Sequence, residues 1–226
     1  MEPAHLKQNA PLEPRPLRIT EIFHSLQGES RSVGVPTVFV RLTGCPLRCV
    51  YCDSEYAFHG GQSMALDAVL SRVHELGARH VCVTGGEPLA QPGCLPLLAQ
   101  LCDAGYTVSL ETSGALSLEA VDPRVIKVMD LKTPDSGESH RNRWENLDHL
   151  GPEDQIKFVL CSRADYDWAS QMLTAHRLAD RCEVLFSPSH HDLPPRELAE
   201  WILEDRLPVR FQIQLHKILW GEEPGR

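Results

Sequence analysis

The interpretation of this chain starts from the stretch Gly44-Cys45-Pro46-Leu47-Arg48-Cys49-Val50-Tyr51-Cys52-Asp53-Ser54. Its three cysteines fall within eight residues, with the spacing Cys-x3-Cys-x2-Cys. A loop this short can wrap one cubic iron–sulfur cluster, with one thiolate on each of three irons. A fourth cysteine would complete the cluster and give an electron carrier. Three thiolates leave one iron without a protein ligand, and that iron can bind a small molecule.

A zinc site is the main alternative, because Cys-x2-Cys is also a zinc-binding spacing. Structural zinc needs four ligands, yet no second Cys-x2-Cys or His-x3-His pair follows the loop. His59 is the nearby candidate for a fourth ligand, and it stands alone. A disulfide between two of the cysteines is a further alternative. The spacing favours the cluster over both.

The composition indicates an acidic single-domain protein of the reducing cytoplasm. The chain has 226 residues, 42% of them hydrophobic, which allows a sizeable core. Its 31 acidic and 22 basic residues give a formal charge of -9, which argues against nucleic-acid binding. We expect no membrane association, since no apolar run has membrane-spanning length and no signal peptide opens the chain. Eight cysteines then indicate free thiols, and five are expected in the core: Cys82, Cys94, Cys102, Cys161 and Cys182.

Strand-like and helical patterns alternate along most of the chain. Residues 1–16 carry four prolines among polar residues and predict a flexible N-terminal extension, and residues 17–226 predict a single catalytic domain. Strands are expected at 17–23, 35–42, 80–84, 106–111, 125–131, 156–161, 183–186 and 209–215, and helices at 65–76, 95–104, 164–177 and 195–205. The alternation predicts an α/β fold with a mainly parallel sheet. Because the chain is short for eight complete β-α units, we expect a partial or trimmed (β/α) barrel.

Polar, glycine-containing segments follow several of these strands, where parallel sheets place their sites. Gly85-Gly86-Glu87-Pro88 ends one strand, and its glycines would let the backbone approach a zwitterion closely, although a simple turn is the alternative. Ser113 ends the next strand. Asp130-Leu131-Lys132 ends another and can bind a carboxylate, a ribose or an adenine edge, with a surface ion pair as the alternative.

Several stretches together resemble the 7-carboxy-7-deazaguanine synthases, a family of radical S-adenosylmethionine enzymes, over residues 17–221. They are Leu26-Gln27-Gly28-Glu29, Val38-Phe39-Val40-Arg41-Leu42-Thr43-Gly44-Cys45, Cys52-Asp53-Ser54, Thr84-Gly85-Gly86-Glu87-Pro88, Glu111-Thr112-Ser113-Gly114 and Gln214-Leu215-His216-Lys217. The Gln-Gly-Glu stretch ahead of the cysteines is the specific part, since the cysteine spacing alone is similar to that of many radical enzymes.

The resemblance implies a radical S-adenosylmethionine fold and a carbon–nitrogen lyase. The implied reaction is the ring contraction of 6-carboxy-5,6,7,8-tetrahydropterin to 7-carboxy-7-deazaguanine with loss of ammonia, in queuosine and deazapurine biosynthesis. The implied cofactors are a 4Fe-4S cluster on Cys45, Cys49 and Cys52, S-adenosyl-L-methionine on the open iron, and Mg²⁺. An external electron donor such as a flavodoxin and a homodimeric state are also implied.

Site residues carry over from the family by position. The substrate would meet Leu26, Gln27, Gly28, Arg41 and Thr84, and S-adenosylmethionine would meet Gly86, Glu87, Ser113, Asp130, Leu131 and Lys132. Ser54 would ligate Mg²⁺, where many relatives have Thr, and Asp130-Leu131 replaces a Ser-Pro of other relatives. From residue chemistry alone, Arg41 could form a structural ion pair, and Ser54 could be a helix cap or turn residue.

Two other functions remain open at this point. A glycyl-radical activating enzyme shares the cysteine spacing, but it needs a groove for a partner protein and gives no reason for Gln27, Gly28 and Ser54. A zinc-binding module without catalysis is the other. Metal analysis of anaerobically purified protein separates the module from the two enzymes. The enzymes would contain iron and sulfide, whereas the module would contain zinc.

Overall fold

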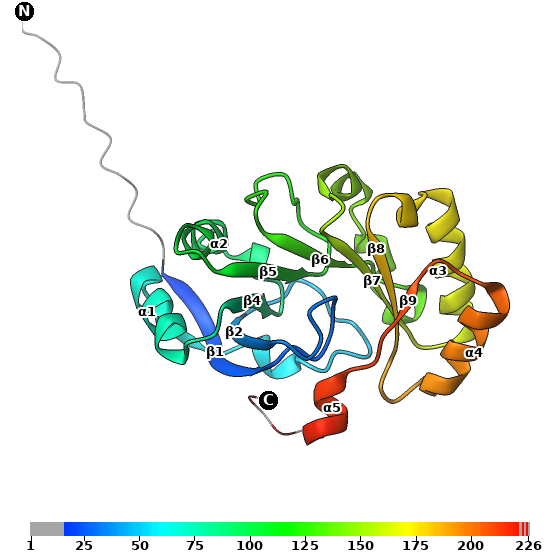
Figure 1. Ribbon diagram of the computed structural model, residues 1–226, viewed down its shortest axis with the longest axis horizontal. Coiled ribbons are helices and arrows are strands. Elements are labelled where there is room, and N and C mark those ends of the chain that lie inside the picture. Colours follow the sequence, from blue (N-terminus) through cyan, green and yellow to red (C-terminus); the bar gives the residue numbers. More distant parts are fainter. Residues whose placement is uncertain (1–15, 222, 224, 226) are drawn as a thin grey trace, which may run out of the picture.

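The computed structural model describes residues 16–221, 223 and 225, so the predicted N-terminal extension lies outside the described residues except for Pro16. One nine-stranded sheet has the order β3-β1-β2-β4-β5-β6-β7-β8-β9 (Figure 1). Its strands are β1 (Leu17–Leu26), β2 (Pro36–Leu42), β3 (Gln62–Met64), β4 (His80–Gly85), β5 (Thr107–Thr112), β6 (Ile126–Asp130), β7 (Gln155–Leu160), β8 (Glu183–Pro188) and β9 (Arg210–Phe211). The α-helices are α1 (Leu66–Leu76), α2 (Cys94–Asp103), α3 (Arg163–Ala175), α4 (Pro195–Asp205) and α5 (Leu215–Trp220).

The sheet is mostly parallel and does not close on itself. Strands β2 and β4 to β9 pair in parallel, whereas β1 is antiparallel to both β2 and β3. Since β3 and β9 are the edges of the sheet, the barrel is open between them. The predicted partial barrel with a mainly parallel sheet is therefore confirmed.

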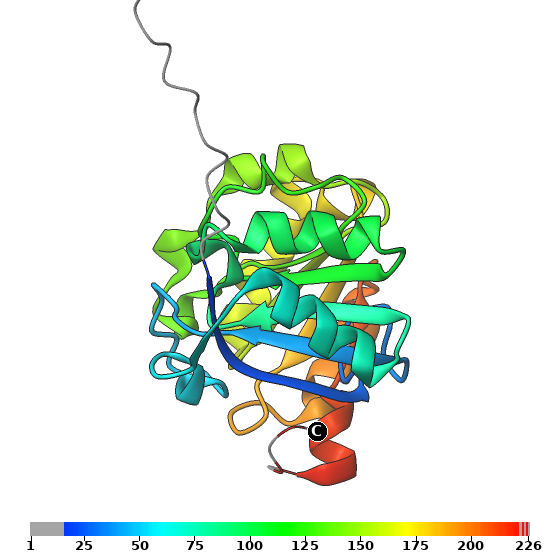
Figure 2. The ribbon, with the colours of Figure 1, turned by 90° about the vertical axis from the view of Figure 1, so that its left-hand side faces the viewer.

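Helices α1 to α4 cover the outer face of the curved sheet, and α1 and α2 lie side by side there (Figures 1 and 2). Each presents an apolar stripe to the core; in α1 this consists of Leu66, Val69 and Val73. Gly77 ends α1 in the left-handed conformation, at a φ of 71°. The inner face of the sheet is left for polar side chains. None of the described helices has both the length and the apolar character needed to cross a membrane.

The C-terminal part differs from the expectation. A strand was expected at 209–215, but only Arg210 and Phe211 pair with β8, and helix α5 begins at Leu215. One more ladder bond follows, from Gln212 N to Phe186 O, and the side chains of Gln212 and Gln214 then bond to Ser30 and Glu29 in the loop that follows β1. Of the five cysteines expected in the core, Cys82, Cys94 and Cys182 are buried, and Cys102 and Cys161 are half-buried.

Candidate active site

A cavity of about 520 Å³ lies on the inner face of the sheet and reaches the carboxyl ends of the parallel strands. Thirteen of the fifteen predicted site residues line it, and the exceptions are Glu87 and Leu131, both buried behind its wall. Those that line it are Leu26, Gln27, Gly28, Arg41, Cys45, Cys49, Cys52, Ser54, Thr84, Gly86, Ser113, Asp130 and Lys132. The fold thus brings together residues spread over more than a hundred positions of sequence.

The cysteine loop is packed directly against the turn that follows β4. Gly44 has a φ of 99°, and its N–H donates to Ala57 O at 2.7 Å. Its carbonyl accepts from Glu87 N at 2.8 Å. A Cβ on Gly86 would lie 2.3 Å from Gly44 O and 2.7 Å from the Cβ of Cys45. Only glycine at position 86 therefore permits this approach of the β4 end to the cysteine loop.

The three loop thiols are free and half-buried, which rules out the disulfide alternative. Burial raises the pKa of all three, that of Cys49 to about 11, and Lys132 is the largest opposing influence on Cys49. Within the described part of the chain, no three His, Cys, Asp or Glu side chains are grouped closely enough to hold one metal ion. Zinc would need its sulfur ligands about 2.3 Å from a common centre. A cubic cluster spreads its thiolates over separate irons, and Cys45, Cys49 and Cys52 all line the cavity where one would sit.

Glu87 is fully buried and ties the ends of β4 and β5 together. Its Oε2 accepts from Ser113 N at 2.8 Å and from Ser113 Oγ at 2.5 Å. Both of its oxygens lie 2.9 Å from the donating hydroxyl of Thr112, and Oε1 accepts from Leu89 N at 3.0 Å. Its carboxylate is thus fully engaged by the protein, and it fixes the position of Ser113 at the cavity wall.

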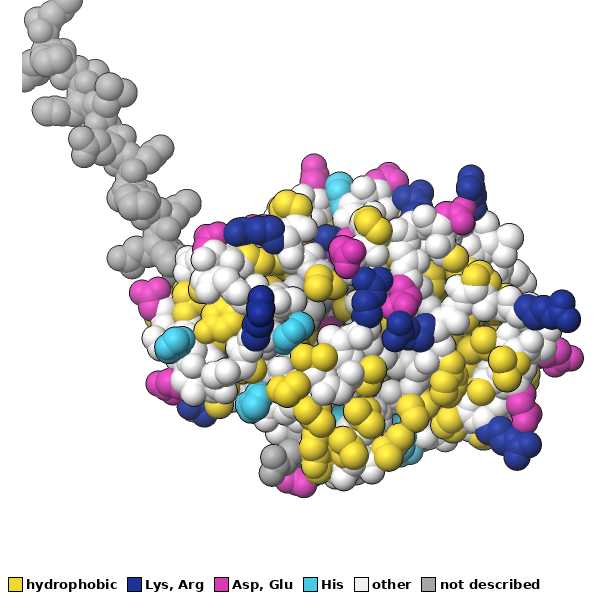
Figure 3. All heavy atoms as spheres, in the orientation of Figure 1, with side chains coloured by type: hydrophobic (Ala, Val, Ile, Leu, Met, Phe, Trp, Pro, Cys, Tyr) yellow, Lys and Arg dark blue, Asp and Glu magenta, His cyan; other side chains and the backbone are white. Residues whose placement is uncertain are grey.

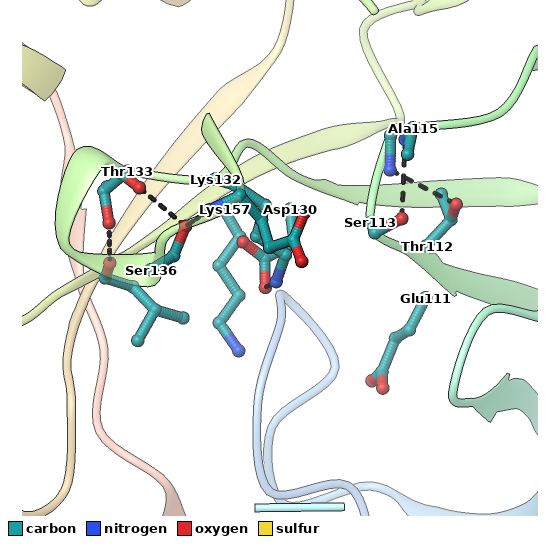
Figure 4. Close-up of polar contacts among 12 residues, drawn as sticks. Glu111, Thr112, Ser113, Ala115, Asp130, Lys132, Thr133, Ser136 and Lys157 are labelled. Carbon is teal, nitrogen blue, oxygen red and sulfur yellow. Dashed lines mark hydrogen bonds and ion pairs between the residues drawn. The ribbon is translucent and has the colours of Figure 1, made fainter. Parts of the chain in front are cut away.

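Asp130 and Lys132 form an ion pair at the end of β6, with Oδ2 and Nζ 2.9 Å apart (Figure 4). Burial alone would lower the pKa of Lys132, but Asp130 and then Tyr51 raise it overall. The second oxygen of Asp130, Oδ1, and the hydroxyl of Tyr51 are buried without a hydrogen-bond partner. Such atoms are costly unless a ligand satisfies them, and a nucleoside with ribose hydroxyls has the donors and acceptors to do so. The residues present therefore fit S-adenosylmethionine.

A second group of polar side chains surrounds Glu111, which no part of the sequence prediction assigned to the site. Glu111 Oε2 accepts from Thr84 Oγ1 at 2.9 Å, and Oε1 accepts from Gln27 Nε2 at 3.2 Å. Figure 4 shows Glu111 and Lys157 extending from their strands toward a shared space. Arg41 Nε contacts Glu21 at 2.7 Å, so the structural ion pair exists, and the arginine lines the cavity as well.

The C-terminal segment contributes further residues that the prediction did not assign. Gln214 Nε2 donates to Glu29 Oε1 at 2.8 Å and to Asp53 Oδ2 at 3.0 Å. Glu29 also pairs with Lys157, and although burial opposes ionisation, Lys157 holds the pKa of Glu29 below its usual value. A Cβ on Gly28 would lie 2.1 Å from His216 Nδ1, so this glycine lets the histidine pack against the loop. One signal was present in the sequence: Lys157 interrupts an otherwise apolar strand.

Ser54 lies just after the last loop cysteine and lines the cavity. It precedes a short 3₁₀ turn (Glu55–Ala57), but its side chain makes no capping bond to that turn. Its hydroxyl donates instead to Asp53 Oδ1 at 2.8 Å. With its proton directed to Asp53, the lone pairs of Ser54 Oγ can face a hard cation.

Comparison with known proteins agrees with this geometry. Residues 39–132 match the family model of the Radical SAM superfamily. The chain is 46% identical to the 7-carboxy-7-deazaguanine synthase of Chlorobaculum tepidum, which covers 92% of this chain and 96% of that protein. It is 45% identical to the 7-carboxy-7-deazaguanine synthase of Koribacter versatilis, over 92% of this chain and 98% of that protein.

Among solved structures, QueE from Escherichia coli has the same fold, with a TM-score of 0.72 and 23% identity over 88% of this chain and 94% of that chain. The sequence relatives are long enough and similar enough to establish the family. This chain belongs to the 7-carboxy-7-deazaguanine synthases of the radical S-adenosylmethionine superfamily.

Proposed function

We propose that this protein contracts the ring of 6-carboxy-5,6,7,8-tetrahydropterin to give 7-carboxy-7-deazaguanine and ammonia. The observation that carries the proposal is one cavity with two differently built walls. One wall is the strand-end region, defined as Gly86, Ser113, Asp130 and Lys132 with Glu87 buried behind them. The other is the loop region, defined as Gln27–Ser30 with Arg41, Thr84 and Glu111. The three loop thiols lie beside both.

The loop region suits a flat pterin that carries a carboxylate. The aminopyrimidinone edge of a pterin presents neighbouring N–H donors, and the Glu111 carboxylate is the acceptor that can receive two of them. Arg41 has its Nε engaged by Glu21, and its terminal nitrogens are suited to fork onto the substrate carboxylate. Phe23 and Phe39 stack with ring centroids 4.9 Å apart and give this wall an apolar surface.

The strand-end region suits S-adenosylmethionine, and Cys45, Cys49 and Cys52 suit a 4Fe-4S cluster. When bound, these cofactors supply the one-electron chemistry that starts the rearrangement. The protein holds Ser113 through Glu87, presents the unpaired oxygen of Asp130, and keeps Lys132 charged beside it. Its contribution is to orient the two ligands toward each other and to exclude water from the space between them.

Mg²⁺ is part of the proposal, with Ser54 as its protein ligand. Mg²⁺ prefers oxygen ligands and keeps several waters, so one hydroxyl together with a substrate carboxylate forms a reasonable set. Asp53 supports this role because it receives the Ser54 proton and is itself held by Gln214.

Two partners complete the proposal. An external electron donor such as a flavodoxin would approach Val50, which lies within the cysteine loop with 79% of its surface exposed. A second copy of the chain would form a cytoplasmic homodimer. Figure 3 shows hydrophobic side chains gathering on the surface near α5, where Ile218 is 64% and Leu219 is 48% exposed. Light scattering of Ile218→Asp against the parent protein tests the dimer, since a charge at that interface should give monomers.

The reaction is tested with anaerobically reconstituted protein, a chemical reductant, S-adenosylmethionine and the carboxylated pterin. We expect 7-carboxy-7-deazaguanine by mass spectrometry, with one ammonia released per product. Iron and sulfide analysis of the same sample addresses the zinc alternative. Loss of S-adenosylmethionine without any pterin product, by protein that holds the full cluster, would contradict the proposed substrate and leave the activating-enzyme alternative.

A further inference from the structure

The loop between β1 and β2 extends across the opening of the barrel. Arg31 N donates to Gln155 Oε1 at 2.6 Å, and its guanidinium lies 3.4 Å from Glu183. Gln155 and Glu183 are the first residues of β7 and β8. The loop thus starts beside one edge of the sheet and is anchored near the other, below the cavity.

Gln212 anchors this loop through both the oxygen and the nitrogen of its side-chain amide. Its Oε1 accepts from Ser30 N at 2.9 Å, and its Nε2 donates to Ser30 O at 2.9 Å. The backbone N–H of Gln212 donates to Phe186 O at 3.0 Å, which continues the pairing of β8 with β9. Gln212 is 4% exposed and Ser30 is 1% exposed, so water does not replace these contacts. One buried side chain therefore joins the two sides of the open barrel.

Ser30 needs such an anchor because its backbone is left-handed, at a φ of 65°. This conformation is unfavourable for a residue with a Cβ unless the surroundings hold it. The residues just before it form the loop region of the cavity. Gln27 reaches Glu111, and Gly28 O accepts from Leu215 N at 3.0 Å. The backbone of Gln27 also pairs with Val35 and Gly34, at 2.9 and 2.7 Å, so the path of the chain at Ser30 acts with these bonds to place Gln27 and Gly28.

We propose that Gln212 is a positioning residue for the pterin: it fixes Ser30 and thereby presents Gln27 and Gly28 to the substrate. The inference rests on the proposed function, because it requires that the loop region bind the pterin. Gln212 itself would not contact the substrate. S-adenosylmethionine and the cluster should be insensitive to Gln212, because the strand-end region is held by Glu87 instead.

The test replaces Gln212 by methionine, which has a similar length but no amide. Gln212→Met leaves the buried N–H of Ser30 unsatisfied and its C=O with only the 3.3 Å bond from Val33 N, so the loop should leave its present path. We expect the KM for the carboxylated pterin to rise by roughly ten- to a hundredfold. The KM for S-adenosylmethionine and the iron content should stay at the parental values. Trypsin should also cut faster after Arg31, and added pterin should slow that cut.

Tyr166→Phe is the matched control for a lost buried hydrogen bond. The Tyr166 hydroxyl lies 2.7 Å from Asp205 Oδ2 and 2.9 Å from Trp201 O, its two acceptors in α4, and Tyr166 does not line the cavity. This variant should lower Tm without changing either KM. Gln212→Asn, which is too short to reach both groups of Ser30, serves if Gln212→Met does not fold.

Three results would overturn the inference. One is a pterin KM that stays parental while Tm falls, as in Tyr166→Phe. Another is an equal rise in the KM values of pterin and S-adenosylmethionine, which indicates general destabilisation. The third is parent protein with a full cluster that does not convert the pterin, and this result refutes the proposed function before any variant is compared.

Discussion

The two walls of the cavity are held in different ways. In the strand-end region, one carboxylate, Glu87, joins neighbouring strand ends whose residues lie 25 and 26 positions apart in the chain. In the loop region, Glu111 meets Thr84 only 27 positions away, but its bond to Gln27 spans 84 positions and the bond of Gln212 to Ser30 spans 182. The strand-end region therefore follows from successive β-α units, whereas the loop region is complete only when the two ends of the barrel have come together.

This difference predicts which ligand a substitution will affect. Damage to the strand-end region should change S-adenosylmethionine binding, and damage to the loop region should change pterin binding. The cysteine loop contacts both ligands in the proposal, so its loss should remove every activity. Taken from the largest expected effect downward, with the two walls expected to be about equally sensitive, the substitutions below test whether the walls act separately.

The largest effect is expected for the loop cysteines. Cys49→Ala should abolish the cluster and all turnover, because two thiolates cannot hold the cubane in place. Iron and sulfide content, with the visible absorption of the reconstituted protein, provide the measurement. Cys94→Ala is the matched control, since Cys94 is a buried thiol of α2. Equal cluster loss in both variants would show that the ligands are wrongly assigned.

Glu87→Gln tests the strand-end region. Every group that contacts the Glu87 carboxylate is a donor, so an amide NH₂ must face either Leu89 N–H or Ser113 N–H. A buried donor left unsatisfied costs about 1–3 kcal/mol, and we expect a rise of roughly five- to a hundredfold in the KM for S-adenosylmethionine. The pterin KM should change little. A selective rise in the pterin KM would instead show that the two walls are not separate.

Arg41→Ala tests the loop region. Loss of a hydrogen bond to a charged group costs about 1.5–3 kcal/mol, which corresponds to a decrease of roughly ten- to a hundredfold in kcat/KM for the pterin. Arg41→Lys should recover only part of it, because an ammonium cannot fork onto a carboxylate. Since Glu21 loses its partner as well, Glu21→Gln is the control for the structural ion pair. Unchanged pterin kinetics in Arg41→Ala would leave that ion pair as its only role.

The two walls also differ in how well they could be predicted from the sequence. The strand-end region was predictable because its glycines and polar residues directly follow apolar strands, at the edge where parallel sheets place ligands. Glu87 was assigned to S-adenosylmethionine as part of this motif, and the structure shows that its carboxylate is bonded within the protein. A short motif indicates where a residue lies, but it does not reveal which partners its side chain meets.

The loop region was predicted only through resemblance to the family. Glu111 lies near the end of a strand in a motif that was recognised, yet its role depends on Gln27, in the loop after β1, and on Thr84 of β4. Residues 209–215 were predicted as a strand from their apolar alternation, and this was wrong beyond Phe211. Local periodicity cannot reveal that Gln212 bonds to a residue 182 positions earlier.

Ser54→Ala should have a smaller effect than these, and one specific to Mg²⁺. The parent rate should increase with Mg²⁺, and the variant should lose most of that increase while it keeps its cluster and its affinity for S-adenosylmethionine. Ser54→Thr retains the hydroxyl and should behave as the parent. Initial rates against Mg²⁺ concentration for the three proteins provide the measurement. An unchanged Mg²⁺ response in Ser54→Ala would place the metal elsewhere.

The smallest effect is expected from the titration of His216, which packs against Gly28 in the loop region. Burial lowers the pKa of His216 below its ordinary 6.5, although Glu29 and Asp53 oppose the shift. The neutral ring is thus the form that the folded protein favours, and its contribution to the stability of the loop region is complete above pH 6.5. It is lost as the pH falls through the lowered pKa, because a charge must then be buried beside the loop.

We therefore expect the pterin KM to rise as the pH falls below 6.5, while the KM for S-adenosylmethionine changes much less. His216→Gln cannot titrate, so its pterin KM should lack this rise. Titration of the pterin itself is common to both proteins and cancels in the ratio of their KM values. Glu29 and Asp53 have lowered pKa values, mainly through Lys157 and Gln214 acting against burial, and stay charged over this range. A ratio that does not vary with pH would mean that the loop region tolerates a charged His216, and that its packing against Gly28 has no part in holding the pterin.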